Sequence, residues 1–256
     1  MACSKKQPAF TLVELLVTLV VISLLSMLVV PSIGKARGLA NSVTCTNNLR
    51  NLGAAMSLYQ SENHDEFCSY VMLNTPGAGL TTYFWGSSSD PVDPLASPFM
   101  KTTNTPLKGL WCPAQPWGSY VPQASVSEPT TTYGYNTWCL APPPWSKKNM
   151  DAGRFLRPKK RHDIKNPTEL FVFADSAMYW APGGVSILQN SAYLEPVTGN
   201  FVQTPTTHFR HDGRANAVTV SGSVKAYNTE GWKFEGKYKP AKLGFVGTEN
   251  RPHYDQ

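Results

Sequence analysis

The chain has 256 residues, of which 41% are hydrophobic and 16% are charged, and its net charge is +6. About 220 residues follow the N-terminal apolar segment, enough for one ordinary globular domain, and the basic excess is too small to indicate nucleic-acid binding by itself. The sequence contains no Gly-x-Ser-x-Gly, His-Glu-x-x-His or phosphate-loop motif, so we expect no enzyme. Its 21 prolines and 19 glycines predict many loops and short strands.

The N-terminal segment contains the clearest pattern in the sequence. A basic leader, Met1 to Ala9, precedes Phe10-Thr11-Leu12-Val13-Glu14 and then an uncharged run from Leu15 to Gly34. An apolar run of about 20 residues is long enough to cross a membrane as a helix. Glu14 is unusual here, because a carboxylate inside a bilayer costs roughly 2.5–3.5 kcal/mol. Its presence therefore indicates a function and a partner.

The residues from Ala9 to Leu16 resemble the processing site of type IV prepilins and type II secretion pseudopilins. In that family, prepilin peptidase removes the leader on the cytoplasmic side of the membrane and methylates the new amino terminus. The resemblance implies a cut between Ala9 and Phe10, with Phe10 as the methylated residue. It also implies that the leader lies inside the cell and that the bulk of the chain lies outside the inner membrane. The family usually has Gly before the cut, where this chain has Ala9.

Glu14 would be the fifth residue of the mature chain. In a stack of such helices, its carboxylate can meet the Phe10 amine of a neighbouring subunit, so that two charges that are costly in lipid compensate each other. This pairing would set the axial register of assembly. The alternative is a capping box formed by Thr11 and Glu14 at the start of the helix. That alternative explains neither the basic leader nor the Phe at the junction.

The helix is expected to continue beyond the membrane, from about residue 10 to residue 61, which is roughly 75 Å long. Pro31, followed by Gly34, predicts a kink. Beyond it, apolar residues recur at three- and four-residue steps and predict a stripe that packs on a sheet. These residues are Leu39, Val43, Leu49, Leu52, Met56 and Tyr59.

Four cysteines remain after Cys3 leaves with the leader: Cys45, Cys68, Cys112 and Cys139. An even number in a domain expected to face the periplasm predicts two disulfides, with all three pairings open. Zinc is the alternative. The sequence has no Cys-x2-Cys pair, and the spacings of 23, 44 and 27 residues do not match a zinc site. We therefore expect no metal centre.

The C-terminal half resembles one branch of the pilin-like family in several patches. The last patch is a signature in which a His is followed after nine residues by Asp-Gly. Here His211 and Gly222 match, but Ser221 replaces the Asp. The other patches are Trp111-Cys112-Pro113, Tyr133-Gly134-Tyr135-Asn136 and the segment from Asn166 to Asp175.

A hairpin is predicted from Ala215 to Tyr227, with its turn at Ser221-Gly222. Asp175, at the end of an apolar strand, could approach His211. Two interpretations follow: a small polar site assisted by calcium, or a buried hydrogen bond that fixes loop geometry. We favour the hydrogen bond, because the sequence has no run of alternating Asp and Asn that would form a calcium loop.

A basic run at residues 154–162 and several Trp-rich loops could bind DNA, acidic lipid or glycan. A solvated loop is the simpler interpretation of the run. We expect most of the tryptophans to anchor the core or the loops.

Together these patterns predict an α+β, pilin-like protein whose long membrane-spanning helix packs on an antiparallel sheet with long loops. The expected parts are a cleaved leader at 1–9, a transmembrane and assembly segment at 10–33 and a periplasmic or extracellular domain at 34–256. The expected function is that of a structural subunit of a type IV pilus or type II secretion pseudopilus. Its partners would be prepilin peptidase, other pilin-like subunits and the assembly platform. The alternative is a monomeric, membrane-tethered binding protein that reuses a pilin leader.

Overall fold

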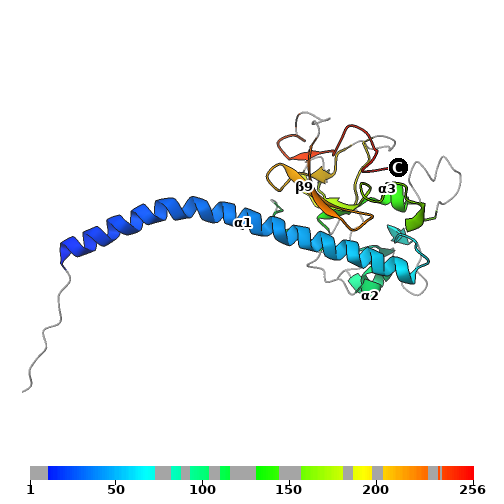
Figure 1. Ribbon diagram of the computed structural model, residues 1–256, viewed down its shortest axis with the longest axis horizontal. Helices are drawn as coiled ribbons and strands as arrows, with labels where there is room; N and C mark the ends of the chain where they lie inside the picture. Colours follow the sequence, from blue (N-terminus) through cyan, green and yellow to red (C-terminus); the bar gives the residue numbers. More distant parts are fainter. Residues whose placement is uncertain are drawn as a thin grey trace, which may run out of the picture. The chain divides into compact units, whose positions relative to one another are not determined.

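A computed structural model describes residues 11–72, 82–87, 93–103, 110–115, 131–143, 157–180, 187–197, 204–229, 236 and 238–256. The described chain is α+β, as predicted: one long helix and several small antiparallel sheets (Figure 1). It divides into two compact units, residues 1–40 and residues 41–256. The predicted boundaries after residues 9 and 33 stay predictions.

Helix α1 runs without interruption from Leu12 to Glu62, in agreement with the predicted helix. It passes through residues 31 and 34, so neither residue ends it, and a kink there stays a prediction. The helix stops where His64 and Asp65 adopt positive φ angles of 55° and 66°. The backbone N–H of Asp65 then donates to the carbonyl of Gln60, which satisfies an acceptor of the last helical turn.

The second half of α1 buries one face against the sheet. Cys45, Leu49, Leu52, Met56 and Tyr59 are buried and belong to one continuous core with strand residues. At 3.6 residues per turn they lie on one side of the helix. The predicted stripe is therefore confirmed from Leu49 onward.

The prediction is wrong for the first two residues of the stripe, because Leu39 and Val43 are exposed. At about 100° per residue, they point roughly 120° and 160° away from the direction of Cys45. Their spacing from Leu49 therefore does not place them on the buried face.

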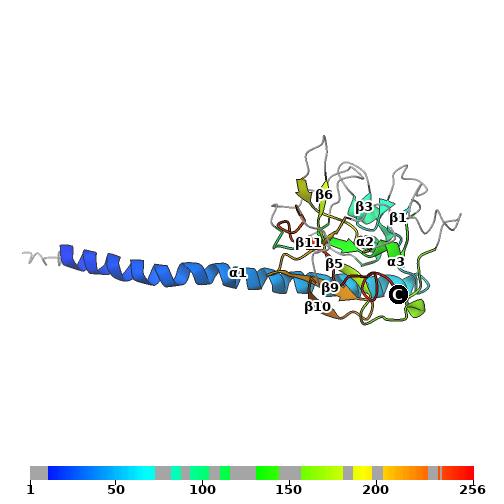
Figure 2. The same cartoon turned by 90° about the horizontal axis from the view of Figure 1, so that it is seen from above.

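The main sheet has four antiparallel strands in the order β10-β9-β5-β4 (Figure 2). These are β4 (Tyr133–Tyr135), β5 (Phe171–Asp175), β9 (Arg214–Thr219) and β10 (Val224–Asn228). Strands β9 and β10 form the predicted hairpin, with Val218 opposite Val224. Gly222 occupies the turn at φ 85°, a conformation that glycine adopts without a Cβ penalty.

Smaller elements surround this sheet. Strand β2 ends at Tyr83, and Phe84 and Trp85 form the turn into β3. The remaining strands are β1 (Val71–Met72), β2 (Thr82–Tyr83), β3 (Gly86–Ser87), β6 (Met178–Trp180), β7 (Ile187–Gln189), β8 (Thr207–His208) and β11 (Leu243–Gly244). The short helices are η1 (Pro94–Ala96), α2 (Pro98–Thr103), α3 (Thr137–Leu140) and η3 (Arg161–Asp163).

Two groups of buried side chains hold the second unit together. In the first, the rings of Phe84 and Tyr135 lie 5.5 Å apart and those of Tyr135 and Phe173 lie 5.2 Å apart. In the second, Tyr254 packs its ring 5.7 Å from Phe171, on β5. Residues near position 254 are therefore part of the core.

Candidate functional site

Thr11 and Glu14 cap the N-terminus of helix α1. Oε2 of Glu14 accepts hydrogen bonds from the Thr11 backbone N–H at 2.9 Å and from the Thr11 hydroxyl at 2.8 Å. The Glu14 N–H donates to Oγ1 of Thr11 at 3.2 Å. This reciprocal pair is the capping box considered above. The other role of Glu14, as a partner for a neighbouring subunit, stays a prediction. Ala9 and Phe10 lie outside the described residues.

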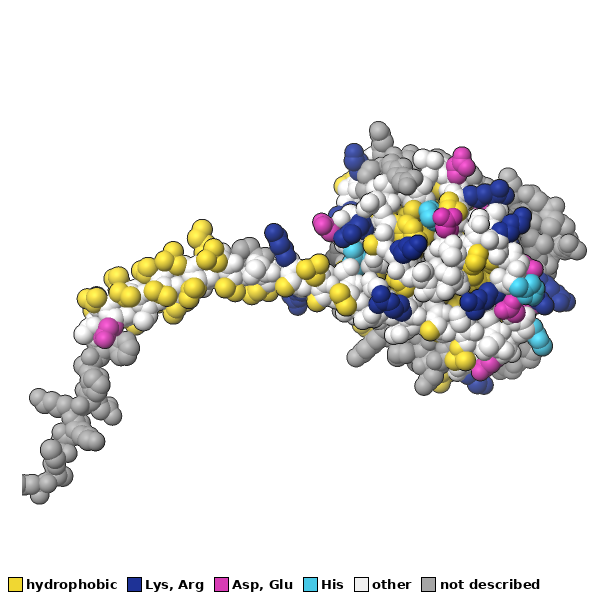
Figure 3. All heavy atoms as spheres, viewed as in Figure 1, with side chains coloured by type: hydrophobic (Ala, Val, Ile, Leu, Met, Phe, Trp, Pro, Cys, Tyr) yellow, Lys and Arg dark blue, Asp and Glu magenta, His cyan; other side chains and the backbone are white. Residues whose placement is uncertain are grey.

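The segment that follows Glu14 is apolar and exposed. All its large hydrophobic side chains that the structure describes, from Leu15 to Ile33, are about half exposed or more. Figure 3 shows hydrophobic side chains along this part of the helix. Helix α1 contains a stretch that is long and apolar enough to cross a membrane. Such a surface requires lipid or other protein to cover it.

The second candidate site lies inside the globular unit. His211, three residues before β9, places Nε2 3.3 Å from Oδ2 of Asp175, at the end of β5. Two cysteines complete the group: Sγ of Cys45, on α1, lies 3.2 Å from Oδ1 of Asp175. Sγ of Cys112 lies 3.3 Å from Nε2 of His211. We call these four residues the buried cluster. All four are buried, and their nearest ligand atoms all lie within 4.8 Å of one another.

Neighbouring residues orient the carboxylate of the buried cluster. The Asn216 backbone N–H donates to Oδ2 of Asp175 at 2.8 Å, and the Asn216 amide contacts Sγ of Cys45 at 3.5 Å. The Arg210 guanidinium lies 3.8 Å from Oδ1 of Asp175. Arg210 also donates to the carbonyls of Thr132 and Ser176. The carboxylate therefore has both hydrogen-bond donors and a fixed positive charge beside it.

These contacts shift the ionisation of the group. Burial disfavours the charged form of Asp175, but Arg210 and His211 outweigh it and lower the pKa of this carboxyl. Burial would also lower the pKa of His211, yet hydrogen bonds to Asp175 and Cys112 raise that pKa to about 9. For Cys45, burial raises the thiol pKa well above its usual value. Burial would raise the pKa of the Cys112 thiol, yet hydrogen bonds to Cys45 and His211 lower that pKa to about 6. The site thus favours the charged forms of both Asp175 and Cys112, beside the cationic side chains of Arg210 and His211.

A family model described as the prokaryotic N-terminal methylation motif matches residues 4–30 of the chain. The motif includes the first part of α1, which begins at Leu12. The match supports a type IV pilin-like protein. The motif implies processing by prepilin peptidase, and proteins that carry it are structural rather than catalytic. No curated protein and no solved structure matches this pilin-like protein.

The four cysteines that the structure describes are buried free thiols. Cys45 and Cys112 share the buried cluster. Cys139 contacts Nζ of Lys159 and Oδ1 of Asp255, each at 3.3 Å, whereas the carbonyl of Cys68 accepts a hydrogen bond from the Tyr135 hydroxyl at 2.9 Å. The two predicted disulfides stay a prediction.

The basic run at residues 154–162 contacts the end of α1, as far as the structure describes it. Nδ1 of His162 lies 2.7 Å from Oδ2 of Asp65. Nearby, the Phe67 N–H donates to the carbonyl of Lys159, and the Arg161 N–H donates to the carbonyl of Asp65. These contacts give the run a structural role in fastening the loop that follows the helix.

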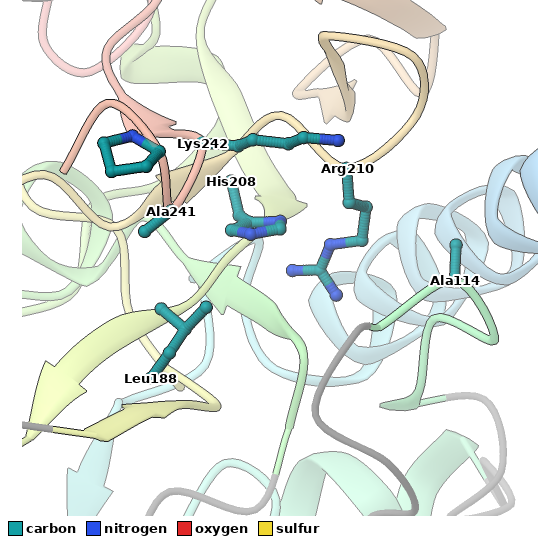
Figure 4. Close-up of a pocket in the computed structure, with 7 residues that line it drawn as sticks. Ala114, Leu188, His208, Arg210, Ala241 and Lys242 are labelled. Carbon is teal, nitrogen blue, oxygen red and sulfur yellow. The ribbon is translucent and has the colours of Figure 1, made fainter. Parts of the chain in front are cut away.

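A pocket of about 310 Å³ adjoins the buried cluster through Arg210, which lines the pocket and contacts Asp175 (Figure 4). His208 and Lys242 also line it. Burial and the nearby Arg210 charge hold the pKa of His208 well below its usual value. Figure 4 shows Arg210 and His208 directed into the same space.

Sequence reasoning weighed disulfides against zinc for the four cysteines, and a calcium-assisted polar site against a buried hydrogen bond for Asp175 and His211. It did not join Cys45 and Cys112 with these two residues, because it searched for ligands at short spacings along the chain. One signal was available: Cys112, Asp175 and His211 each lie in a patch that resembles the same branch of pilin-like proteins.

Proposed function

We propose that this pilin-like protein is a subunit of a type IV pilus or a type II secretion pseudopilus. Prepilin peptidase would cut it before Phe10 and methylate that residue. The subunits would then leave the inner membrane and associate with one another through α1. The observation behind this proposal is that the methylation motif at residues 4–30 coincides with the exposed apolar part of α1, which begins at Leu12.

The exposure of that helix supports assembly. The described large apolar side chains between Leu12 and Ile33 lie on all sides of the helix, and all of them are exposed. A helix that is apolar all round is stable when it is fully covered. Lipid would cover it before assembly, and the helices of neighbouring subunits would cover it in a filament. The globular unit would then lie on the periplasmic or extracellular side.

Glu14 is the residue that would set the register between subunits. In the isolated chain its carboxylate accepts two hydrogen bonds from Thr11. In the proposed filament it would also face the methylated amine of Phe10 from a neighbour. In a low-dielectric environment an unpaired charge is costly, and the Coulomb attraction between the two charges is strongest when they are in contact. One axial position would therefore be favoured over the others.

The first experiment is mass spectrometry of the N-terminal peptide of the protein isolated from its native cell. A methylated terminus at Phe10 supports the proposal. An intact Met1, or a cut after the apolar segment, contradicts it.

A pair of variants tests the role of Glu14. Glu14→Ala removes the carboxylate and should leave a folded, membrane-inserted protein that is poorly incorporated into filaments. Thr11→Ala is the matched control, because it removes the hydroxyl that pairs with Glu14 and keeps the charge. It should assemble close to the wild-type level. Normal assembly of Glu14→Ala, or equal loss in both variants, would assign Glu14 to helix capping alone.

Crosslinking distinguishes assembly from a tethered monomer. Single cysteines introduced at exposed positions such as Val20 and Leu28 should form crosslinks between subunits in the membrane. Position 39, which is also exposed, extends the scan along the helix. If none of these positions gives crosslinks, the protein is a membrane-tethered binding protein instead.

A further inference from the structure

The geometry of the buried cluster differs from that of a catalytic relay. In a relay, a carboxylate contacts one ring nitrogen of a histidine and the nucleophile contacts the other. Here Sγ of Cys112 and Oδ2 of Asp175 both lie 3.3 Å from the same atom, Nε2 of His211. One nitrogen cannot serve two such partners with a single proton or lone pair. The ligand atoms instead surround a common point.

We propose that Cys45, Cys112, Asp175 and His211 bind a zinc ion at that point. Tetrahedral zinc, with Zn–S near 2.3 Å and Zn–N and Zn–O near 2.1 Å, places its ligand atoms about 3.4–3.8 Å apart. Three separations in the buried cluster are 3.2, 3.3 and 3.3 Å, the first to Oδ1 and the last to Oδ2 of Asp175, and all four ligand atoms lie within 4.8 Å of one another. Small movements of these side chains would therefore accommodate the ion.

The donor atoms select zinc over calcium. Two sulfurs and an imidazole nitrogen suit zinc, whereas calcium takes six to eight oxygen ligands. The charge also fits: two thiolates and one carboxylate carry three negative charges, and zinc leaves one of them. Arg210, 3.8 Å from Asp175, offsets that remaining charge.

Asn216 supplies the supporting hydrogen bonds that a metal site requires around its ligands. Its backbone N–H holds Oδ2 of Asp175, and its side-chain amide lies against Sγ of Cys45. Contacts of this kind fix the orientation of ligands and tune their affinity. The protein therefore provides both the metal ligands and the hydrogen bonds that orient them.

The site would be structural rather than catalytic. The protein supplies four ligands and buries all of them, so no coordination position stays open for a substrate. Cys45 comes from α1, Asp175 from β5, and the other two ligands from loops beside the sheet. Zinc would clamp the helix to the sheet, and its binding free energy would add to the stability of the fold. Binding releases the protons carried by the ligand atoms to solvent and requires no oxidant or reductant.

A disulfide between Cys45 and Cys112 is the competing outcome. It would form by two-electron oxidation of the thiols, and it would use only two of the four side chains. The structure holds both cysteines as thiols. The convergence of Asp175 and His211 on the same point favours the metal.

The test begins with elemental analysis of the full-length protein, purified in detergent without chelator. One zinc per chain is expected, and Cys45→Ser and Cys112→Ser should each lose it. Cys68→Ser is the matched control, because Cys68 is also a buried thiol but lies outside the buried cluster. It should retain the zinc.

A second measurement keeps the test valid if the variants fail to fold. Removal of zinc from the wild-type protein with a strong chelator should lower Tm, and added Zn²⁺, but not Ca²⁺, should restore it. Co²⁺ in place of zinc should give the absorption of tetrahedral thiolate coordination. The proposal is overturned if the non-reduced native protein contains a Cys45–Cys112 disulfide, or if the purified wild-type protein contains no zinc. It is also overturned if the Cys45→Ser variant retains zinc, or if the protein contains one equivalent of a different metal.

Discussion

The Sγ atom of Cys45 lies 3.2 Å from Oδ1 of Asp175, although the two residues are 130 positions apart in the chain. The contact joins α1 to β5 inside a face of the helix that is otherwise apolar. Apolar contacts alone allow a helix to slide along a sheet at small cost, because they are not directional. A polar contact at a single point removes that freedom. The Cys45 contact, together with the hydrogen bonds of Asn48 to Trp111 and Tyr133, therefore restricts the position of α1 on the sheet.

At Gly53, helix α1 packs closely against strand β9. A Cβ built on Gly53 would lie 2.8 Å from Cγ2 of Val218, which is too close for carbon atoms. We predict that Gly53→Ala lowers the free energy of unfolding by about 1–3 kcal/mol, the usual range for overpacking a core. Denaturant unfolding of the full chain in detergent, followed by Trp fluorescence, measures this change.

Gly38 provides the control for that substitution. It lies in the same helix, and nothing is found within 4 Å of the Cβ that alanine would add. Gly38→Ala should leave stability unchanged or raise it by up to about 1 kcal/mol, because alanine favours a helix over glycine. The second mutation Val218→Ala should restore part of the stability that Gly53→Ala loses. Equal effects at the two glycines would contradict the close approach of α1 and β9.

The Tyr254 hydroxyl is a buried hydrogen-bond centre. It accepts from the Val246 N–H at 3.0 Å and lies 2.8 Å from Oγ1 of Thr207. Tyr254→Phe keeps the ring and leaves the buried Val246 N–H without this acceptor, which should cost about 1–3 kcal/mol. The double variant with Thr207→Val should cost less than the sum of the two single changes, because both act on one network. Strict additivity would show that the two hydroxyls are independent.

His208 should make stability depend on pH. It is 1% exposed, and burial, with the nearby Arg210, holds its pKa well below 6.5. The unfolded chain takes up a proton at this residue below about pH 6.5, whereas the folded chain resists it. His208 therefore lowers stability as pH falls, by up to about 1.4 kcal/mol per pH unit. The slope between pH 7.5 and 5.5 should be shallower in His208→Gln. The same slope in both proteins would rule out His208 as its source.

Cys68 and Cys139 are expected to stay reduced and unreactive in the folded protein. Burial raises the pKa of the Cys68 thiol to about 12 and that of Cys139 to about 11, and the thiolate is the reactive form. Alkylation at pH 8 should modify both residues only after unfolding. A peptide that links either cysteine to another in the non-reduced protein would instead support the disulfides that the cysteine count predicts.

Local patterns predicted the elements whose contacts are close in sequence. The helix followed from its apolar periodicity, and the β9–β10 hairpin followed from alternation around Ser221-Gly222. The stripe was misplaced at Leu39 and Val43, because periodicity shows which residues share a face only after that face has been fixed by tertiary contacts.

The buried cluster could not be assembled from spacing. Its members come from α1, β5, and two loops, one of which precedes β9, and only the fold brings them together. The sequence did indicate that Asp175 follows an apolar strand and that His211 belongs to a signature. What it lacked was the register that pairs β5 with β9, where Ala174 lies opposite Ala217. That register places Asn216 against Asp175 and sets the geometry of the site.

The backbone N–H of Phe171 donates to the carbonyl of His253 at 2.9 Å, and Tyr254 packs between Phe171 and Phe245. In the proposed topology the chain crosses the membrane with its anchor first, so these residues are among the last core residues to arrive. The β9–β10 hairpin could form earlier, but the core would be incomplete until Tyr254 has crossed the membrane and packed on Phe171 and Phe245. During that interval the cysteines are accessible to periplasmic oxidants and thiol chaperones, which they no longer are once the domain has closed.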